Sequence, residues 1–249
     1  MVGALGVAIL VAVWEMVSRL GLLTPDVAPS FLQTVAELGA LVVDPRFQSS
    51  LGFTLRSWVI GFVITASLAV PVGLFFGVNT RAWRWFRSTF EAVRPIPPIV
   101  VLPLAILVLG AGTSFTTVMI MQGVFWLILI QVTYGTSVIP AVTVDTAKVF
   151  HVGILRRYAL FRLPSAAPII TTGLRIAAGI SLAVQIMSEL IGGVPGIGQM
   201  LISAQAGNDI PRIYALTAFT GLLGLAVALA LRAAERWLLR NFGPGGGAE

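Results

Sequence analysis

The chain contains no cysteine and a single histidine, His151, among its 249 residues. Without cysteine it forms no disulfide and offers no thiolate metal site, and its sequence gives no indication of the redox compartment. One histidine likewise excludes a histidine-based metal cluster. A nucleotide-binding loop of the form GxxxxGK[ST] is also absent, and we expect no catalytic residue, no metal and no cofactor.

Charged residues are scarce too, at 10% of the chain, whereas hydrophobic residues make up 57%. Soluble domains carry about 25% charged residues, so the composition predicts a membrane protein. The apolar runs are continuous and close to the length that crosses a bilayer as a helix, without the alternation expected of a barrel strand. We therefore expect an all-α membrane protein with about six transmembrane helices. The predicted spans are 3–23, 54–78, 96–112, 115–138, 168–191 and 212–234.

The ends of the predicted domain and its third span have particular features. Residues 1–242 are expected to form a single transmembrane domain and 243–249, GPGGGAE, a flexible tail. The first span is too long for a cleavable signal peptide and is expected to remain as an anchor. No basic residue precedes it, which leaves the natural start of the chain open. Three prolines predict a short, kinked third span; they are Pro97, Pro98 and Pro103.

The distribution of positive charge predicts an orientation in the membrane. Basic residues concentrate on the cytoplasmic side of membrane proteins. We therefore expect both termini and the loop 139–167 on the cytoplasmic side of a bacterial inner membrane. The same rule accounts for the net charge of +6, because basic loops contact membrane lipid. We therefore do not expect nucleic acid as a partner. The residues concerned are Arg81, Arg84, Arg87 and Arg94; Lys148, Arg156, Arg157 and Arg162; and Arg232, Arg236 and Arg240.

One polar, basic segment, 145–164 (DTAKVFHVGILRRYALFRLP), separates the fourth and fifth predicted spans. A segment of this composition has no reason to lie in lipid. Phe150 with its valine neighbours forms an apolar knob that a groove on a partner could bury, at about 1.5–3 kcal/mol for a large side chain. Asp145 suits the positive end of a short helix. The alternative is an amphipathic loop that rests on the lipid surface.

Sequence blocks with a fixed order and spacing run from about residue 28 to 240. They are Ala28-Pro29-Ser30 with Thr34; Thr54-Leu55-Arg56 with Gly61-Phe62 and Pro71-Val72-Gly73; Arg94-Pro95-Ile96-Pro97-Pro98 with Leu102-Pro103-Leu104-Ala105-Ile106; and Gly173-Leu174-Arg175-Ile176-Ala177 with Glu189 and Gly196-Ile197-Gly198. Together these blocks resemble the permease subunits of type I binding-protein-dependent ABC importers, in the nitrate, sulfonate, taurine and bicarbonate branch. The resemblance implies the MetI-like permease fold.

The resemblance also implies a set of partners. Such a permease pairs with a second permease subunit, here expected to be a second copy. It binds a cytoplasmic ABC ATPase dimer, which carries out all ATP hydrolysis, so the chain itself is expected not to be an enzyme. A periplasmic or lipid-anchored binding protein delivers the solute, which the branch implies is small and anionic or polar organic.

Segment 145–164 resembles the coupling loop by which these permeases dock onto the ATPase. It departs from the family pattern at two places. Asp145 replaces a glutamate, and His151 replaces a glycine whose turn Gly153 would supply instead. The docking residues that the resemblance implies are Asp145, Ala147, Phe150, His151, Gly153, Arg156, Arg157, Leu163 and Pro164.

Polar residues inside the predicted spans are candidates for the solute path. A carboxylate in a span is costly and indicates a function by default, so Glu189 is interpreted as a gate or path residue near the outer end of the fifth span. The alternative is an interfacial carboxylate satisfied by water or by the Gly192-Gly193 turn. Uncharged polar residues in spans also join helices by hydrogen bonds. The path candidates are Glu189, Gln185, Ser181, Gln122 and Tyr134.

Three further charged residues complete the prediction. Glu15 and Arg19 are four positions apart and should pair on one helix face. Arg175 should lie near the cytoplasmic end of its span, extending to the surface or pairing with the coupling loop. The alternative function is an ion-coupled secondary transporter or channel that uses Glu15 and Glu189, but it leaves the basic loop unexplained.

Overall fold

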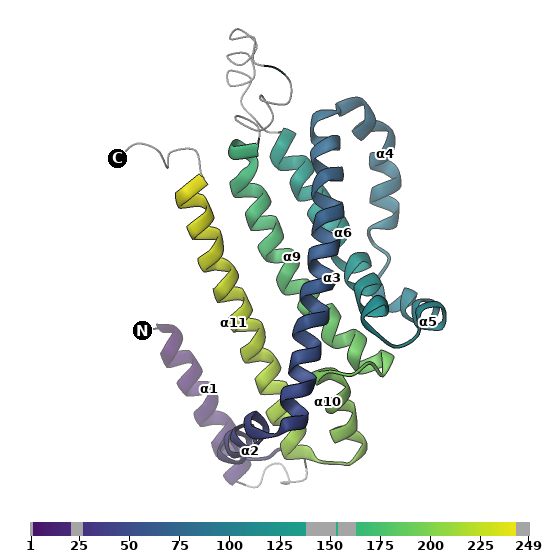
Figure 1. Ribbon diagram of the computed structural model, residues 1–249. Helices are drawn as coiled ribbons and strands as arrows, with labels where there is room; N and C mark the ends of the chain where they lie inside the picture. The colour runs from purple at the N-terminus through teal and green to yellow at the C-terminus, as the bar shows by residue number, and fades with distance from the viewer. Residues whose placement is uncertain (1, 21–26, 138–152, 154–162, 243–249) are drawn as a thin grey trace. The chain divides into compact units, whose positions relative to one another are not determined.

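The computed structural model describes residues 2–20, 27–137, 153 and 163–242 (Figure 1). Within these residues the chain forms nine helices and no strand, which confirms the all-α fold class. The helices are α1 Val2–Arg19, α2 Phe31–Val43, α3 Pro45–Val78, α4 Thr80–Val93, α5 Pro98–Leu109, α6 Thr113–Ser137, α9 Leu163–Gly192, α10 Ile197–Ala206 and α11 Ile210–Phe242.

Four of these helices are long and apolar enough to cross a membrane. They contain the predicted second, fourth, fifth and sixth spans almost entirely. Helix α3 has 34 residues, or about 51 Å at 1.5 Å per residue, so it exceeds the roughly 30 Å of a hydrocarbon core. Helix α1 covers the described part of the first predicted span, whose crossing of the membrane stays a prediction. The membrane-length segments are Pro45–Val78, Thr113–Ser137, Ala166–Gly192 and Ile210–Trp237.

The third predicted span corresponds to the short helix α5. Helix α5 has 12 residues, or about 18 Å, and follows α4 at an angle of 86°. The break lies before Pro98, which takes the first helical position where proline is tolerated, whereas Pro103 lies inside α5 without ending it. By length and composition, the described residues give a fifth span if α4 and α5 are counted as one bent pair.

Helix α4 occupies a region that the sequence analysis treated as a cytoplasmic loop. Aromatic residues recur along one face of α4 at helical spacing and pack against the end of α3 and the middle of α6. The Phe90 ring lies 5.2 Å from Phe76 and 5.5 Å from Trp126, between centroids. This apolar face explains why α4 forms, because amphipathic helices are stabilised mainly by burying one side.

The chain divides into two compact units. The boundaries between the units fall inside α3, α9 and α11, so each of these helices contributes residues to both units. The first unit comprises Met1–Arg56 and Ile186–Gly224. Its core joins α2, the start of α3, α10 and the start of α11, with Phe47 and Phe219 in edge-to-face contact at 4.7 Å. The buried core residues are Leu41, Phe47, Ile197, Ala204, Ala215 and Leu216.

The second unit comprises Ser57–Gln185 and Leu225–Glu249. Its α3 and α6 pack closely because glycines of α3 face α6. A Cβ atom at Gly73 would lie 2.7 Å from the Val132 Cβ atom, and one at Gly77 would overlap the Thr136 hydroxyl. Thr133 of α6 also donates a hydrogen bond to the Gly73 carbonyl oxygen at 3.2 Å. Small residues at helix contacts are the usual means of close packing in membranes.

Candidate functional site

The predicted coupling loop lies almost entirely outside the described residues. This holds for Asp145, Ala147, Phe150, His151, Arg156 and Arg157. Gly153 is described and exposed. Leu163 and Pro164 form the first two positions of α9, where proline is compatible with a helix. The docking role of this loop therefore stays a prediction.

Glu189 is a fully buried residue on α9. Its Oε2 atom accepts a hydrogen bond of 3.0 Å from the backbone N–H of Gly198, at the second position of α10. The first N–H groups of a helix lack partners within the helix, and the positive end of the helix dipole favours a carboxylate. Glu189 thus caps α10. Satisfaction of this carboxylate by water, one form of the alternative, is contradicted because the side chain is enclosed.

Two glycines make room for this carboxylate. Gly196, the N-cap residue of α10, has φ +152 and ψ −175, which only glycine adopts readily. A Cβ atom there would overlap the Glu189 carboxylate. A Cβ atom at Gly198 would lie 2.8 Å from the Glu189 Cβ atom and would overlap the Ile186 carbonyl oxygen. The sequence block Gly196-Ile197-Gly198 is therefore explained by the close approach of α9 to α10.

A second side chain caps the same helix end. The hydroxyl oxygen of Thr54, a buried residue of α3, accepts a hydrogen bond of 3.0 Å from the Ile197 N–H. The Thr54 hydroxyl itself donates to the Ser50 carbonyl oxygen at 3.1 Å. Consecutive N–H groups at the start of α10 are therefore bound by side chains from two other helices, α3 and α9. In the sequence Thr54 stood out only as part of a family block, and this role was not predicted.

The remaining path candidates lie in the second unit and do not form one site. Ser181, fully buried on α9, accepts a hydrogen bond of 2.8 Å from the Trp58 indole of α3, so it joins two helices. Gln185 is also fully buried, one turn further along α9. On α6, Tyr134 is 57% exposed and lies twelve positions, or about 18 Å, from Gln122.

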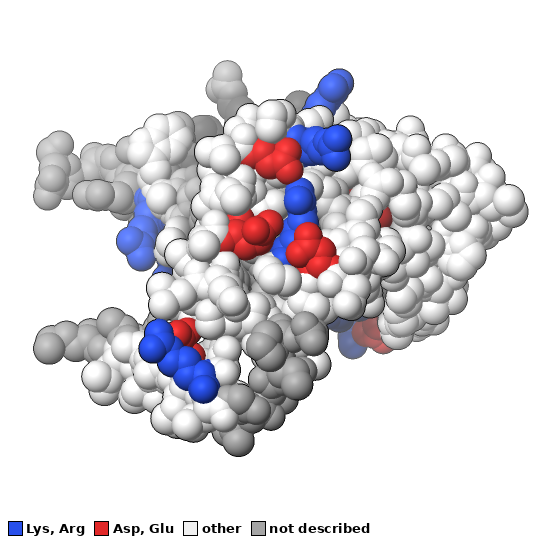
Figure 2. All heavy atoms as spheres, turned by 90° about the horizontal axis from the view of Figure 1, so that it is seen from below, with Lys and Arg blue, Asp and Glu red and all other residues white. Residues whose placement is uncertain are grey.

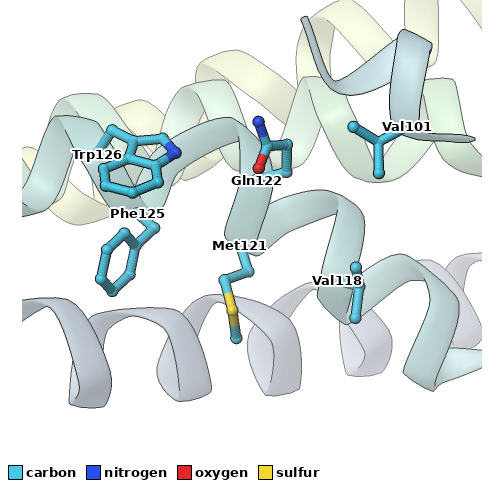
Figure 3. Close-up of a pocket in the computed structure, with 6 residues that line it drawn as sticks. All are labelled: Val101, Val118, Met121, Gln122, Phe125 and Trp126. Carbon is cyan, nitrogen blue, oxygen red and sulfur yellow. The ribbon is translucent and has the colours of Figure 1, made fainter. Parts of the chain in front are cut away.

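Gln122 belongs to an apolar pocket of about 240 Å³ on α5 and α6 (Figure 3). Its Nε2 atom donates to the Ile96 carbonyl oxygen at 3.3 Å. Among the residues that line this pocket, only Gln122 and Trp126 carry a polar side-chain group. The pocket therefore suits an apolar group. The lining residues are Val101, Val118, Met121, Gln122, Phe125 and Trp126.

Two ion pairs involve charged residues that the sequence places in or near the predicted spans. Arg19 and Glu15 form the predicted ion pair, with 2.7 Å between Nε and Oε1, and Glu15 also accepts from the Phe31 N–H at 3.0 Å. Arg175 pairs with Glu235 of α11, 2.9 Å between Nε and Oε2. Glu235 was missed, because a single carboxylate within a run of basic residues gives no sign of its partner.

The first unit also carries a polar groove of about 460 Å³ beside α10. Arg212 donates to Asp44 at 2.9 Å, and the Arg46 N–H donates to the same carboxylate at 2.8 Å. These hydrogen bonds, that from the Arg46 N–H first, hold the pKa of Asp44 below its usual range. Figure 2 shows acidic and basic side chains side by side on the face seen from below. The groove is lined by Arg46, Gln199, Met200, Ser203, Ala204, Gly207, Asp209 and Arg212.

Long apolar helices, paired charges and capped helix ends define a multi-pass membrane protein whose polar residues mainly order its helices. Across the described ranges no three histidine, cysteine or acidic side chains come together as a metal site would require. The model of the family described as "Binding-protein-dependent transport system inner membrane component" matches residues 69–243. The chain belongs to this family, and is thus a permease subunit of a binding-protein-dependent ABC importer.

Named relatives and a solved structure agree with this assignment. The bicarbonate transport system permease protein CmpB of Synechococcus elongatus is 30% identical over 182 residues, 73% of this chain and 66% of that one. The taurine transport system permease protein TauC of Escherichia coli is 26% identical over 238 residues, 93% and 86% of the two chains. An inward-facing structure of the MetNI methionine ABC transporter matches 78% of this chain and 96% of the other with a TM-score of 0.69 and 17% identity, which shows the shared fold.

Proposed function

We propose that this permease subunit forms the path for a small anionic or polar organic solute and is driven by a separate ATPase that docks onto segment 145–164. The observation that carries the proposal is the position of that segment. It is basic and polar, it lies between the membrane-length helices α6 and α9, and it falls inside the family match at 69–243. The named relatives transport bicarbonate and taurine, which favours a small charged solute here as well.

The chemistry of the docking segment supports this role. Phe150 provides the apolar side chain that a groove on the ATPase would bury, and Asp145 provides a charge at the positive end of a loop helix. Arg156 and Arg157 would face acidic residues of the ATPase or lipid head groups. Because the chain contains no phosphate-binding loop, hydrolysis of ATP belongs to the ATPase dimer.

The arrangement of the complex follows from the same reasoning. The basic segments face the cytoplasm together with both termini, and a second copy of the permease completes the path. By the same rule we expect the link between α10 and α11 to face the periplasm, and with it the groove beside α10. We propose that a periplasmic or lipid-anchored binding protein delivers the solute there, because the exposed Arg46 offers a contact to acidic residues of that protein.

The test is whether the docking segment controls association with the ATPase. Phe150→Ala removes most of an aromatic side chain, which costs about 3–5 kcal/mol in a packed site, so affinity should fall by orders of magnitude at about 1.4 kcal/mol for each factor of ten. Asp145→Ala should cost less, since a charge at the rim is screened by salt. Co-purification of the ATPase and solute-stimulated ATP turnover measure both effects.

Leu32→Ala is a suitable control, because Leu32 is an exposed apolar residue of α2 far along the chain from the segment. It should leave association and turnover unchanged. Normal association and turnover in both segment variants would show that 145–164 is not the coupling element. ATP hydrolysis by the purified chain alone would also contradict the proposal.

A further inference from the structure

The hydrogen bonds from Glu189 and Thr54 to the start of α10 connect this helix to α9 and α3, and α10 lines part of the groove. We propose that Glu189 and Thr54 act as a clamp that fixes α10 to α9 and α3, so that a wall of the groove follows the movement of α9. This inference rests on the proposed function in one respect, which is that the groove receives the binding protein. Glu189 is then a positioning residue that acts through α10, and not a charge presented to the solute.

The enclosure of Glu189 is the first argument. Its side chain is fully buried, and its Oε2 atom is bound to the Gly198 N–H at 3.0 Å. The carboxylate occupies the space that a side chain at Gly196 would need. A group so enclosed makes no direct contact with a passing solute, whereas any displacement of α9 near Glu189 must also displace the start of α10 or break this hydrogen bond.

The second argument is the shared attachment at Thr54. The Ile197 N–H is bound by the Thr54 hydroxyl oxygen at 3.0 Å, so adjacent backbone groups of α10 are held by different helices. Ile197 itself is fully buried in the core of the unit. Helix α10 has ten residues, and a helix this short is marginal in isolation and depends on its contacts for order. Its position is therefore set where it is clamped.

The third argument is the location of the groove relative to the clamp. Gln199, Ser203 and their neighbours place much of the groove lining on α10 itself. The link from α9 to α10 turns at Gly193, which has φ +63, and at Gly196. Glycines in these conformations allow a tight reversal of the chain but contribute no side chain to hold it. The hydrogen bonds of Glu189 and Thr54 therefore fix the position of α10 and, with it, the groove residues that α10 carries.

The absence of cysteine allows a direct test with a nitroxide spin label at a single introduced cysteine. Ser203→Cys places the label on an exposed position of α10, and Leu32→Cys places a reference label on α2. In the purified full-length permease, Glu189→Ala and Thr54→Val should each raise the mobility of the α10 label several-fold and leave the α2 label unchanged. Glu189→Gln, which keeps an oxygen acceptor, should restore most of the immobility.

Thr34→Val is the matched control for Thr54→Val. Thr34 is a buried threonine of the same unit, and its hydroxyl donates to Ser30 O within its own helix end. It should not alter the α10 label. Equal mobility of that label in the unaltered protein, Glu189→Ala and Thr54→Val would overturn the clamp. An unchanged α2 label shows that the variants are folded, so a loss of folding is not mistaken for a released α10.

A second readout separates the clamp from the proposed function. In the complex with its ATPase, the ratio of ATP turnover with and without the binding protein should fall in Glu189→Ala and recover in Glu189→Gln. An unaltered ratio in Glu189→Ala would refute the coupling of α9 to the groove. If the unaltered complex showed no response to its binding protein while the α10 label was released in the variants, the clamp would stand and the proposed function would fail.

Discussion

Arg175 of α9 and Glu235 of α11 form an ion pair with 2.9 Å between Nε and Oε2, and Thr172 donates to the other oxygen of Glu235 at 2.6 Å. The pair is sheltered, with 31% of the Arg175 side chain and 13% of the Glu235 side chain exposed. One carboxylate therefore binds two residues three positions apart on α9. This contact fixes the second half of α11 within its unit.

Loss of either partner of this pair should destabilise the protein. We expect Glu235→Ala and Arg175→Ala each to lower the free energy of unfolding by about 1–3 kcal/mol, because each leaves a sheltered charged group without its partner. The double variant should lose less than the sum of the two. Thermal unfolding of the detergent-solubilised permease measures these changes.

The exposed Arg87–Glu91 pair of α4 is the control for that series. It has 2.7 Å between Nε and Oε1, with more than half of each side chain exposed. Glu91→Ala should therefore cost about 0–1 kcal/mol. A loss as large as that of Glu235→Ala would mean that shelter from water is not what strengthens the Arg175–Glu235 pair.

Glycines of α3 should respond according to what they face. Gly73→Ala and Gly77→Ala place a Cβ atom against α6, and overpacking of this kind costs about 1–3 kcal/mol. Gly52→Ala, in the same helix, adds its Cβ atom to open space and should be neutral or stabilising by about 0.4–1 kcal/mol. Equal unfolding temperatures for all three variants would contradict the close contact of α3 with α6.

Asp44 should make stability depend on acidity. The pKa of its carboxyl is lowered in the folded state by the hydrogen bonds from Arg46 and Arg212. Its contribution is thus complete above the ordinary aspartate pKa of about 3.9 and is lost as the pH falls through the lower folded value. The difference in unfolding temperature between the unaltered protein and Asp44→Asn should shrink below about pH 4. A difference that stays constant down to about pH 3 would contradict this assignment.

The orientation of the chain is open to a direct test. Reporter fusions at residue 249 and within 139–167 should both report the cytoplasm, because the basic residues gather at these places. A fusion in the link between α10 and α11, at Asn208, should report the opposite side. Any exchange of these signals would overturn the predicted topology.

The sequence predicted the helices that satisfy a simple rule of length. Continuous apolar runs identified α3, α6, α9 and α11, since a membrane-length helix needs only a sustained run. The same rule did not predict α4, because its arginines interrupt the apolar run. Its aromatic face, which packs on Phe76 and Trp126, was therefore not recognised. The prolines predicted that the third span is short, as α5 is, but the angle of 86° between α4 and α5 is a tertiary feature that the length of an apolar run does not predict.

The individual site residues show where sequence reasoning stops. Glu15 and Arg19 were predicted to pair because their spacing is local. Glu189 was recognised as exceptional, but its partner Gly198 depends on the reversal of the chain at Gly196, and Thr54 reaches the same helix end from far away in the sequence. Such contacts are set by packing and leave no periodic signal.

The bend between α4 and α5 bears on how the chain enters the membrane during its synthesis. A segment is released into lipid as a unit when it offers about 20 apolar residues in one helix, and α4 and α5, with 14 and 12 residues, each fall short. Helix α6 begins four residues after α5 ends and is long enough by itself. We expect a nascent chain stalled before α6 to leave α5 at the membrane surface, whereas synthesis of α6 draws both helices in together.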